Sequence, residues 1–168
     1  NRLARAKQIL SRLIDLRKND KVALIVFAGE AYVQMPLTSD TQSAKIFLNT
    51  IDPSLVPIQG TAIGQAISLG MSCLSADQEI SKAMVIITDG EDHGENTVNI
   101  AAEAAKAGVM INLIGIGSPD GSPIRSTEYG SNFMTDSEGN VVVSRLNEQM
   151  AMEIAQSGGG FYIRADNS

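Results

Sequence analysis

The sequence predicts an α/β fold: a doubly wound (Rossmann-like), mostly parallel sheet with one antiparallel edge strand, helices on both faces and a β-hairpin insertion. Short apolar runs rich in β-branched residues alternate with segments of helical periodicity, which is typical of βαβ units. Residues 83–87 form an uninterrupted apolar run that is too short for a helix, as expected of a central strand buried on both sides in a parallel sheet. With 168 residues, the chain fits one domain with a sizeable core.

The individual elements follow from local patterns. Apolar residues recur at helical spacing from Leu3 to Leu16, so the sequence opens within an amphipathic helix. Residues 21–28 are a buried strand, and the alternating run that follows ends at Pro36, which indicates a hairpin at the sheet edge. Asp40 has the chemistry of a helix N-cap. The expected strands are 21–28, 31–35, 83–88, 109–116 and 161–163, and the expected helices are 2–17, 40–50, 61–74, 97–107 and 147–157.

Residues 118–145 interrupt the alternation of strands and helices. Gly and Pro crowd the first half of this segment. In its second half, residues 132–134 and 141–143 flank a polar stretch at 136–140. This pattern predicts the β-hairpin insertion.

Composition excludes several classes of function. Acidic residues outnumber basic residues by 19 to 13, which gives a formal net charge of −6. The chain has no block of Lys or Arg and only 4% aromatic residues, so a nucleic-acid surface is disfavoured. No apolar run approaches the length of a transmembrane helix, and no signal peptide opens the sequence. We therefore expect this stretch of chain to be soluble by itself.

The catalytic motifs that can be tested are missing or incomplete. His93 is the only histidine, and no Gly-x-Ser-x-Gly nucleophile elbow accompanies it. The glycines at 115–121 suggest a dinucleotide loop, but Pro119 and Pro123 stand where a helix should begin. No Gly-Lys-Ser/Thr phosphate loop is present. These observations argue against a hydrolase triad, a dinucleotide-binding enzyme and an NTPase.

Two oxygen ligands remain as candidates for a site. Asp89 is the first acidic residue after the apolar run 83–87, and ligands bind at the carboxyl ends of parallel strands. Thr61 lies at the start of a predicted helix. A carboxylate and a hydroxyl are ligands that Mg²⁺ accepts. Each residue also has a purely structural interpretation, Asp89 in an Asp-Gly turn and Thr61 as a helix cap, and the spacing alone leaves both open.

Both candidates lie in motifs that resemble a known family. Thr61 within residues 60–64 (Gly-Thr-Ala-Ile-Gly) and Asp89 within residues 86–90 (Ile-Ile-Thr-Asp-Gly) resemble the second and third loops of the metal-ion-dependent adhesion site of von Willebrand factor type A (VWA) domains. Further blocks resemble bacterial Bat-type aerotolerance proteins, particularly those of the BatB kind. These blocks are residues 1–3, 27–29, 36–38, 52–57, 88–93, 115–119 and 142–146.

The resemblance implies a non-catalytic module that binds one divalent cation, Mg²⁺ or Mn²⁺, through Thr61 and Asp89. The open position on the ion would take an acidic residue of a protein partner, such as another Bat-type or membrane-associated protein. It also implies a parent protein anchored in the inner membrane, with this domain facing the periplasm. The rim expected to contact the partner comprises Gly29, Glu30, Gln59, Gly60, Gly90, Glu91, Asp92 and His93.

The sequence departs from the family pattern at its beginning. In VWA domains, a first strand and an Asp-x-Ser-x-Ser metal loop precede the helix with which this sequence opens, and neither is present. We therefore expect residues 1–168 to be a single, N-terminally truncated VWA-like domain without a tightly bound ion. Strands 21–28 and 83–88 would then either pair directly or self-associate with another copy.

Two alternatives to a metal-dependent module remain open. A metal-free scaffold would bind its partner by the shape of the same face alone. An enzyme of unknown type is the other alternative, although no pair of base and nucleophile can be assembled from the sequence.

Overall fold

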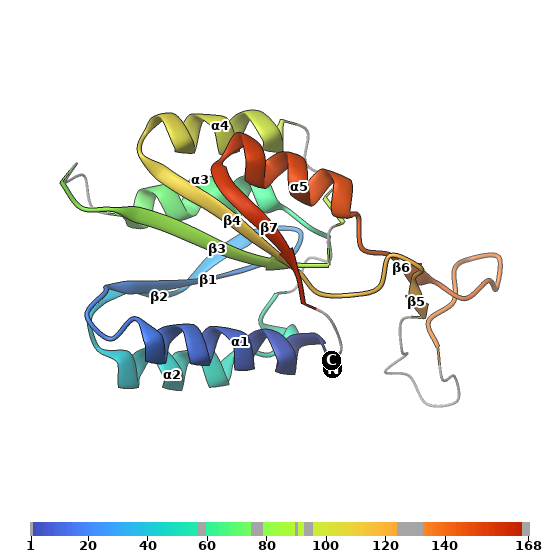
Figure 1. Ribbon diagram of the computed structural model, residues 1–168. Helices are drawn as coiled ribbons and strands as arrows, with labels where there is room; N and C mark the ends of the chain where they lie inside the picture. The colour runs from blue at the N-terminus through green and yellow to red at the C-terminus, as the bar shows by residue number, and fades with distance from the viewer. Residues whose placement is uncertain are drawn as a thin grey trace.

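The computed structural model describes residues 2–56, 60–74, 79–89, 91–92, 96–123 and 133–165 (Figure 1). Helices α3, α4 and α5 lie on one side of the strands, and α1 and α2 lie on the other (Figure 1). The helices are α1 (Arg2–Leu16), α2 (Thr41–Thr50), α3 (Ile63–Cys73), α4 (Thr97–Lys106) and α5 (Glu148–Ser157), with a short 3-10 helix at Pro53–Leu55. The strands are β1 (Val22–Phe27), β2 (Ala31–Thr38), β3 (Lys82–Thr88), β4 (Val109–Gly115), β5 (Ser122–Pro123), β6 (Val143–Ser144) and β7 (Gly159–Arg164). No helix within the described ranges is both long enough and apolar enough to cross a membrane.

The strands confirm a mixed α/β architecture with a parallel sheet and an antiparallel hairpin. β3, β4 and β7 form a three-stranded parallel sheet in the order β3-β4-β7. β1 and β2 form a separate antiparallel pair. The expected doubly wound arrangement is therefore present, with helices on both faces, but its strands are divided into two hydrogen-bonded groups.

The seam between β1 and β3 corrects two expectations. Among the described residues, β1 pairs only with β2 and β3 only with β4, so β1 and β3 do not pair directly. β3 is consequently an edge strand of its sheet rather than a central one, and Val85 on it is 36% exposed. Within the described residues, no other strand pairs with the second edges of β1 and β3.

Helix α3 holds the two groups of strands together. It contacts both β1 and β2, while Ile63 and Ile67 on the same helix pack in the core of the parallel sheet. Gly70 shows how close this packing is. A Cβ atom at Gly70 would lie 2.8 Å from Cε of Met84 on β3 and 3.5 Å from Cδ1 of Ile25 on β1. The absence of a side chain at Gly70 thus lets α3 cover the seam.

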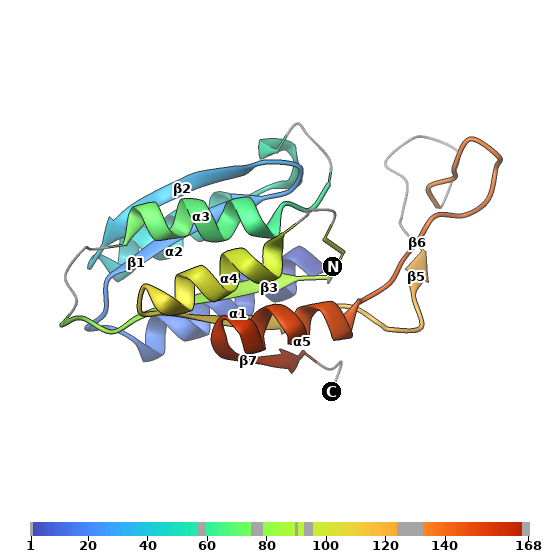
Figure 2. The same ribbon diagram turned by 90° about the horizontal axis from the view of Figure 1, so that it is seen from above.

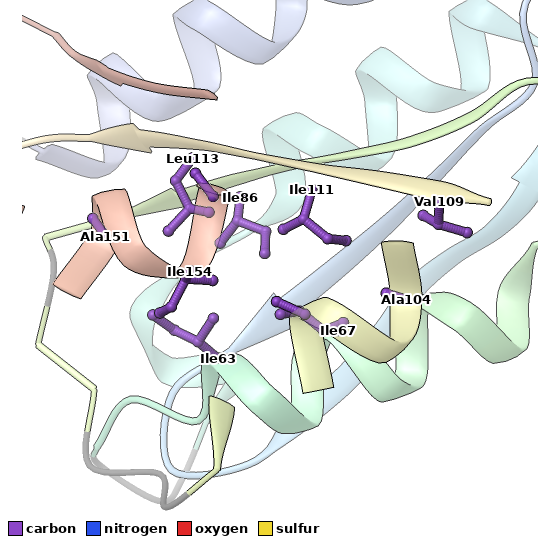
Figure 3. Close-up of a cluster of buried hydrophobic side chains, with 11 residues drawn as sticks. Ile63, Ile67, Ile86, Ala104, Val109, Ile111, Leu113, Ala151 and Ile154 are labelled. Atoms are coloured by element: carbon purple, nitrogen blue, oxygen red, sulfur yellow. The ribbon is translucent and has the colours of Figure 1, made fainter. Parts of the chain in front are cut away.

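The main core lies between the parallel sheet and helices α3, α4 and α5 (Figure 3). Its fully buried side chains come from alternate positions of β4 and from the apolar faces of the helices. A second cluster lies between α1, α2 and the β1–β2 pair. The first cluster comprises Ile63, Ile67, Ile86, Ala101, Ala104, Val109, Ile111, Leu113, Ala151, Ile154 and Ala155, and the second comprises Ile14, Leu24, Met35, Ala44 and Leu48.

Two strands extend beyond their expected ends. β2 continues through Pro36 to Thr38, and Pro36 is accommodated because it lies at an irregular register of an edge strand, between the pairs Leu24–Met35 and Val22–Thr38. β7 begins at Gly159, two residues before its expected start at residue 161. A side chain at Gly160 would overlap the carbonyl oxygen of Ile111, so a glycine permits this close pairing.

The insertion is a hairpin that projects away from the rest of the molecule (Figures 1 and 2). Near its tip, Thr135 bridges Val141 and the Val142 N–H donates to the Met134 carbonyl at 2.8 Å, which confirms the predicted hairpin there. Its base is closed by β5 and β6, which the sequence pattern did not indicate. Residues 124–132 lie outside the described ranges. We call residues 118–146 the arm.

The main core predicts the effect of removing buried methyl groups. Ile67→Ala deletes a side chain with no exposed surface and should lower the free energy of unfolding by roughly 2–5 kcal/mol. Ile46→Ala is the matched control, because Ile46 is also helical but 64% exposed, and it should change stability by about 0.5 kcal/mol or less. Urea unfolding measures both values. Equal effects of the two substitutions would contradict the assignment of the core.

The seam predicts self-association. The edges of β1 and β3 that face away from their partners offer backbone groups to a further strand. We expect light scattering of the 168-residue chain to give a mass above the 17.8 kDa of one copy. Addition of an upstream segment that supplies a strand should restore a monomer. A monomeric 168-residue chain would mean that the unpaired edges do not recruit a second copy.

Candidate functional site

The loops that could form a site meet at one edge of the molecule. β3, β4 and β7 are parallel, so their carboxyl ends lie at the same edge. The amino ends of α1, α3, α4 and α5 and the turn after β1 lie at that edge as well (Figures 1 and 2). Polar residues that follow the strands are therefore brought together at a place where open α/β sheets bind ligands.

Asp89 is the centre of a three-residue cluster at this edge. It directly follows β3, and its side chain is 34% exposed. Nη1 of Arg2, at the start of α1, donates to Asp89 Oδ2 at 3.1 Å and to Ser144 Oγ at 2.9 Å. The Ser144 hydroxyl, on β6, lies 3.4 Å from the same carboxylate oxygen. Asp89 is therefore more than a turn residue, because its carboxylate already holds a cationic group and a hydroxyl.

Thr61 is half-buried in the loop before α3. α3 begins at Ile63 with Ala62 in the N-cap position, and no side chain caps it. The capping interpretation of Thr61 is therefore wrong, and the helix is shorter than expected because it starts two residues later. Within the described residues, no hydrogen bond links the Thr61 hydroxyl to Asp89. The loop is positioned through Gly60, where a Cβ atom would lie 3.2 Å from Cα of Gly29.

The turn after β1 carries two of the expected rim residues. The Ala28 N–H donates to the Glu30 carbonyl at 2.9 Å, which closes the turn around Gly29. The Tyr32 hydroxyl donates to a Glu30 carboxylate oxygen at 2.6 Å. That hydrogen bond, with smaller contributions from desolvation and from the Glu30 charge, raises the pKa of Tyr32. The Glu30 carboxylate is thus held by a side chain of its own hairpin.

The loop after β3 carries four more of the expected rim residues, at positions 90–93. A Glu91 carboxylate oxygen accepts a long hydrogen bond of 3.4 Å from the Arg145 N–H, so this loop touches the base of the arm. Asp92 is half-buried, and it also interacts with another group of the protein. The remaining rim residues, Gln59, Gly90 and His93, lie outside the described ranges.

Sequence reasoning missed Arg2 and Ser144. Arg2 belongs to the basic face of α1, and its position in that pattern predicts a side chain exposed to solvent. Ser144 lies in an insertion without helical or strand periodicity. They meet Asp89 from 87 and 55 positions away in the sequence. No local signal could have indicated these contacts, because they depend on the placement of α1 and the arm at the carboxyl edge.

The donor atoms at this edge fit a hard cation in kind. They are carboxylate and hydroxyl oxygens, which Mg²⁺ and Mn²⁺ prefer, and Asp89 already attracts a positive group. They are few in number, however. In the part of the chain that the structure describes, no group of three or more Asp, Glu, His or Cys side chains is arranged to hold a metal ion. A cation would have to rely on Asp89, nearby hydroxyls and water.

Solved structures of high similarity come from Bacteroides. One is the conserved hypothetical protein BatB from Bacteroides thetaiotaomicron, with 48% identity and a TM-score of 0.93 over 99% of this chain and 80% of that one. Another is an aerotolerance-related membrane protein from Bacteroides fragilis, solved with multiple mutations to serine. It has 50% identity and a TM-score of 0.91 over 98% of this chain and 81% of that one.

Two more distant proteins also match most of this chain. An uncharacterized protein of Borreliella burgdorferi is 27% identical over 99% of this chain, which spans about half (48%) of that protein's length. Proximal thread matrix protein 1 of the mussel byssus, solved with a zinc-occupied adhesion-site motif, shares the fold at 20% identity, with a TM-score of 0.68 over 96% of this chain and 36% of that one. The sequence profile of the von Willebrand factor type A domain matches residues 1–153, and this chain therefore belongs to the VWA domain family.

Proposed function

We propose that this chain is the protein-binding module of a membrane-anchored bacterial protein related to aerotolerance or stress, and that it recognises an acidic residue of its partner through a divalent cation. The observation that carries the proposal is the position of Asp89. It is a partly exposed carboxylate at the carboxyl edge of the sheet, where open α/β sheets bind ligands. Belonging to the VWA family and close similarity to BatB support an interaction role.

Each residue at the carboxyl edge would have a separate role in binding the cation and the partner. The Asp89 carboxylate and the Thr61 hydroxyl would hold the cation, and Ser144 would orient the carboxylate through its hydroxyl. When bound, the ion supplies a coordination position that a carboxylate of the partner can fill. The β1–β2 turn and the loop after β3 would form the rim around that position. No nucleophile or general base is needed for this role, so we propose binding without catalysis.

The location of the parent protein is part of the same proposal. The Bacteroides fragilis relative, 50% identical, is described as an aerotolerance-related membrane protein. We propose that the parent of this chain is anchored in the inner membrane and presents this domain to the periplasm, where another Bat-type or membrane-associated protein would be its partner. Protease treatment of spheroplasts, with intact and lysed cells compared, tests which side of the membrane carries the domain.

A metal-independent scaffold is the second candidate. The ion pair between Arg2 and Asp89 favours it, because the carboxylate is neutralised without any metal. In that case the carboxyl edge would recognise its partner by shape and by direct hydrogen bonds. The two candidates differ in one measurable property, the effect of a chelator on partner binding.

Capture of the partner by the full-length parent tests the metal-dependent function. With Mg²⁺ or Mn²⁺ present, Asp89→Asn should weaken capture at least about tenfold. The reason is that the ion would have few protein ligands, and this substitution removes a charged one. Thr61→Ala should weaken capture less, because a neutral hydroxyl is lost. EDTA should reduce capture by the unaltered protein to the level of Asp89→Asn.

Glu153→Gln is the matched control for Asp89→Asn. It removes the same charge from an exposed position on α5 and should leave capture unchanged. Circular dichroism should show the same helical content in all variants. Capture that ignores both EDTA and Asp89→Asn would support the metal-independent scaffold instead.

A further inference from the structure

We propose that Arg2 is a built-in competitor of the divalent cation at Asp89, and that ion binding displaces Arg2 and loosens the base of the arm. This inference concerns the regulation of the site and rests on the proposed function for its physiological meaning. It is carried by the cluster of Arg2, Asp89 and Ser144, which joins three separate segments of the chain at one carboxylate oxygen.

The guanidinium of Arg2 lies against the carboxylate that would hold the proposed cation. Nη1 lies 3.1 Å from Asp89 Oδ2, and a Cβ atom at Gly117 would lie 3.9 Å from Cζ of Arg2. The group is therefore placed between the loop after β3, the loop after β4 and β6. A divalent cation on either oxygen of this carboxylate would stand close to the guanidinium. Two positive groups at such a short separation repel each other, so the ion and Arg2 compete.

The same guanidinium ties the arm to α1. Ser144 is only 3% exposed, and its hydroxyl accepts from Arg2 Nη1 at 2.9 Å. The Ser144 hydroxyl also makes a longer contact of 3.4 Å to Asp89 Oδ2. The base of the arm is otherwise closed by the β5–β6 pair and by the Leu146 N–H, which donates to the Ser118 carbonyl at 3.2 Å. Departure of Arg2 would remove the strong hydrogen bond that fixes Ser144 to the edge.

The ion pair is weak enough to be displaced. Both side chains are about one-third exposed, 37% for Arg2 and 34% for Asp89. An exposed ion pair of this kind contributes a factor of up to about five in an equilibrium constant. A divalent cation carries twice the charge of a guanidinium and can exceed that contribution. Because binding linkage is reciprocal, whatever loosens Arg2 tightens ion binding, and ion binding loosens what Arg2 holds.

The test uses the 168-residue chain and Mn²⁺ alone as the probe. Paramagnetic broadening of the amide signals of Thr88, Asp89 and Gly117 reports binding at the site, even when affinity is in the millimolar range. We expect Arg2→Gln to lower the Kd for Mn²⁺ by roughly fivefold or more, which is the loss of the ion pair plus the loss of repulsion. Arg2→Lys keeps the charge and should behave nearly as the unaltered chain does.

Arg12→Gln is the matched control. Arg12 is exposed on the same helix, ten residues along, which corresponds to about 15 Å of helix and lies beyond the screening length at physiological salt. It loses the same charge as Arg2→Gln and should leave the Kd for Mn²⁺ within about twofold. An equal change in both variants would show a general charge effect and would overturn the competition.

Amide hydrogen exchange supplies a second readout. Saturating Mn²⁺ should raise the exchange of the Ser144, Arg145 and Leu146 amides in the unaltered chain, and Arg2→Gln should raise it without Mn²⁺. The Ile111 and Leu113 amides in β4 serve as the reference and should stay protected in both cases.

The outcomes separate this inference from the proposed function. An unchanged Kd in Arg2→Gln, an absence of Mn²⁺ broadening in that variant, or an arm base whose exchange ignores Mn²⁺ would overturn the competition. Partner capture that ignores EDTA would overturn the proposed function, yet tighter Mn²⁺ binding by Arg2→Gln would still support the role of Arg2.

Discussion

The packing of α3 across the seam between β1 and β3 is the interaction on which the rest of the structure depends. No backbone ladder joins these two strands in the described part of the chain, so their alignment relies on side chains. Ile63 and Ile67 bury themselves in the core of the parallel sheet, while the same helix contacts β1 and β2. Gly70 allows the helix to approach Met84 and Ile25 at once. The carboxyl ends of both strand groups therefore reach one edge, where the candidate site lies.

Much of the fold could be predicted because its signals are local. The apolar run of β3, the helical spacing in α1 and the turn residues around Asp40 each depend on neighbours in sequence, and each element formed where expected. The Asp40 carboxylate accepts from the Gln42 and Ser43 N–H groups, and hydrogen bonds from Ser43, with a smaller one from Gln42, lower the pKa of Asp40. Features that depend on distant partners were missed. They include the continuation of β2 through Pro36, which requires an edge position, and the start of β7 at Gly159, which requires a close approach to β4.

The candidate site was predictable to the same extent. Asp89 was identified because a carboxylate at the end of a parallel strand faces the functional edge in any fold of this class. Its partners were not, since Arg2 arrives from the start of α1 and Ser144 from an insertion without periodicity. The helix-cap interpretation of Thr61 failed for a local reason, because α3 begins beyond it and has no side-chain cap. A sequence pattern thus locates the charge at the site but not the group that neutralises it.

The packing of α3 and the contact between Arg2 and Asp89 both connect the β1–β2 pair to the parallel sheet. Ile14 of α1 packs with Leu24 and Leu48 on the β1–β2 side of the molecule, whereas Asp89 ends β3 on the other side of the seam. The contact between Arg2 and Asp89 therefore joins the two halves at the carboxyl edge, as α3 joins them over one face. An ion pair at a partly exposed edge contributes far less free energy than a buried helix interface. The link at the edge is consequently the one that a charged ligand can exchange, while the packing under α3 keeps the two halves in place.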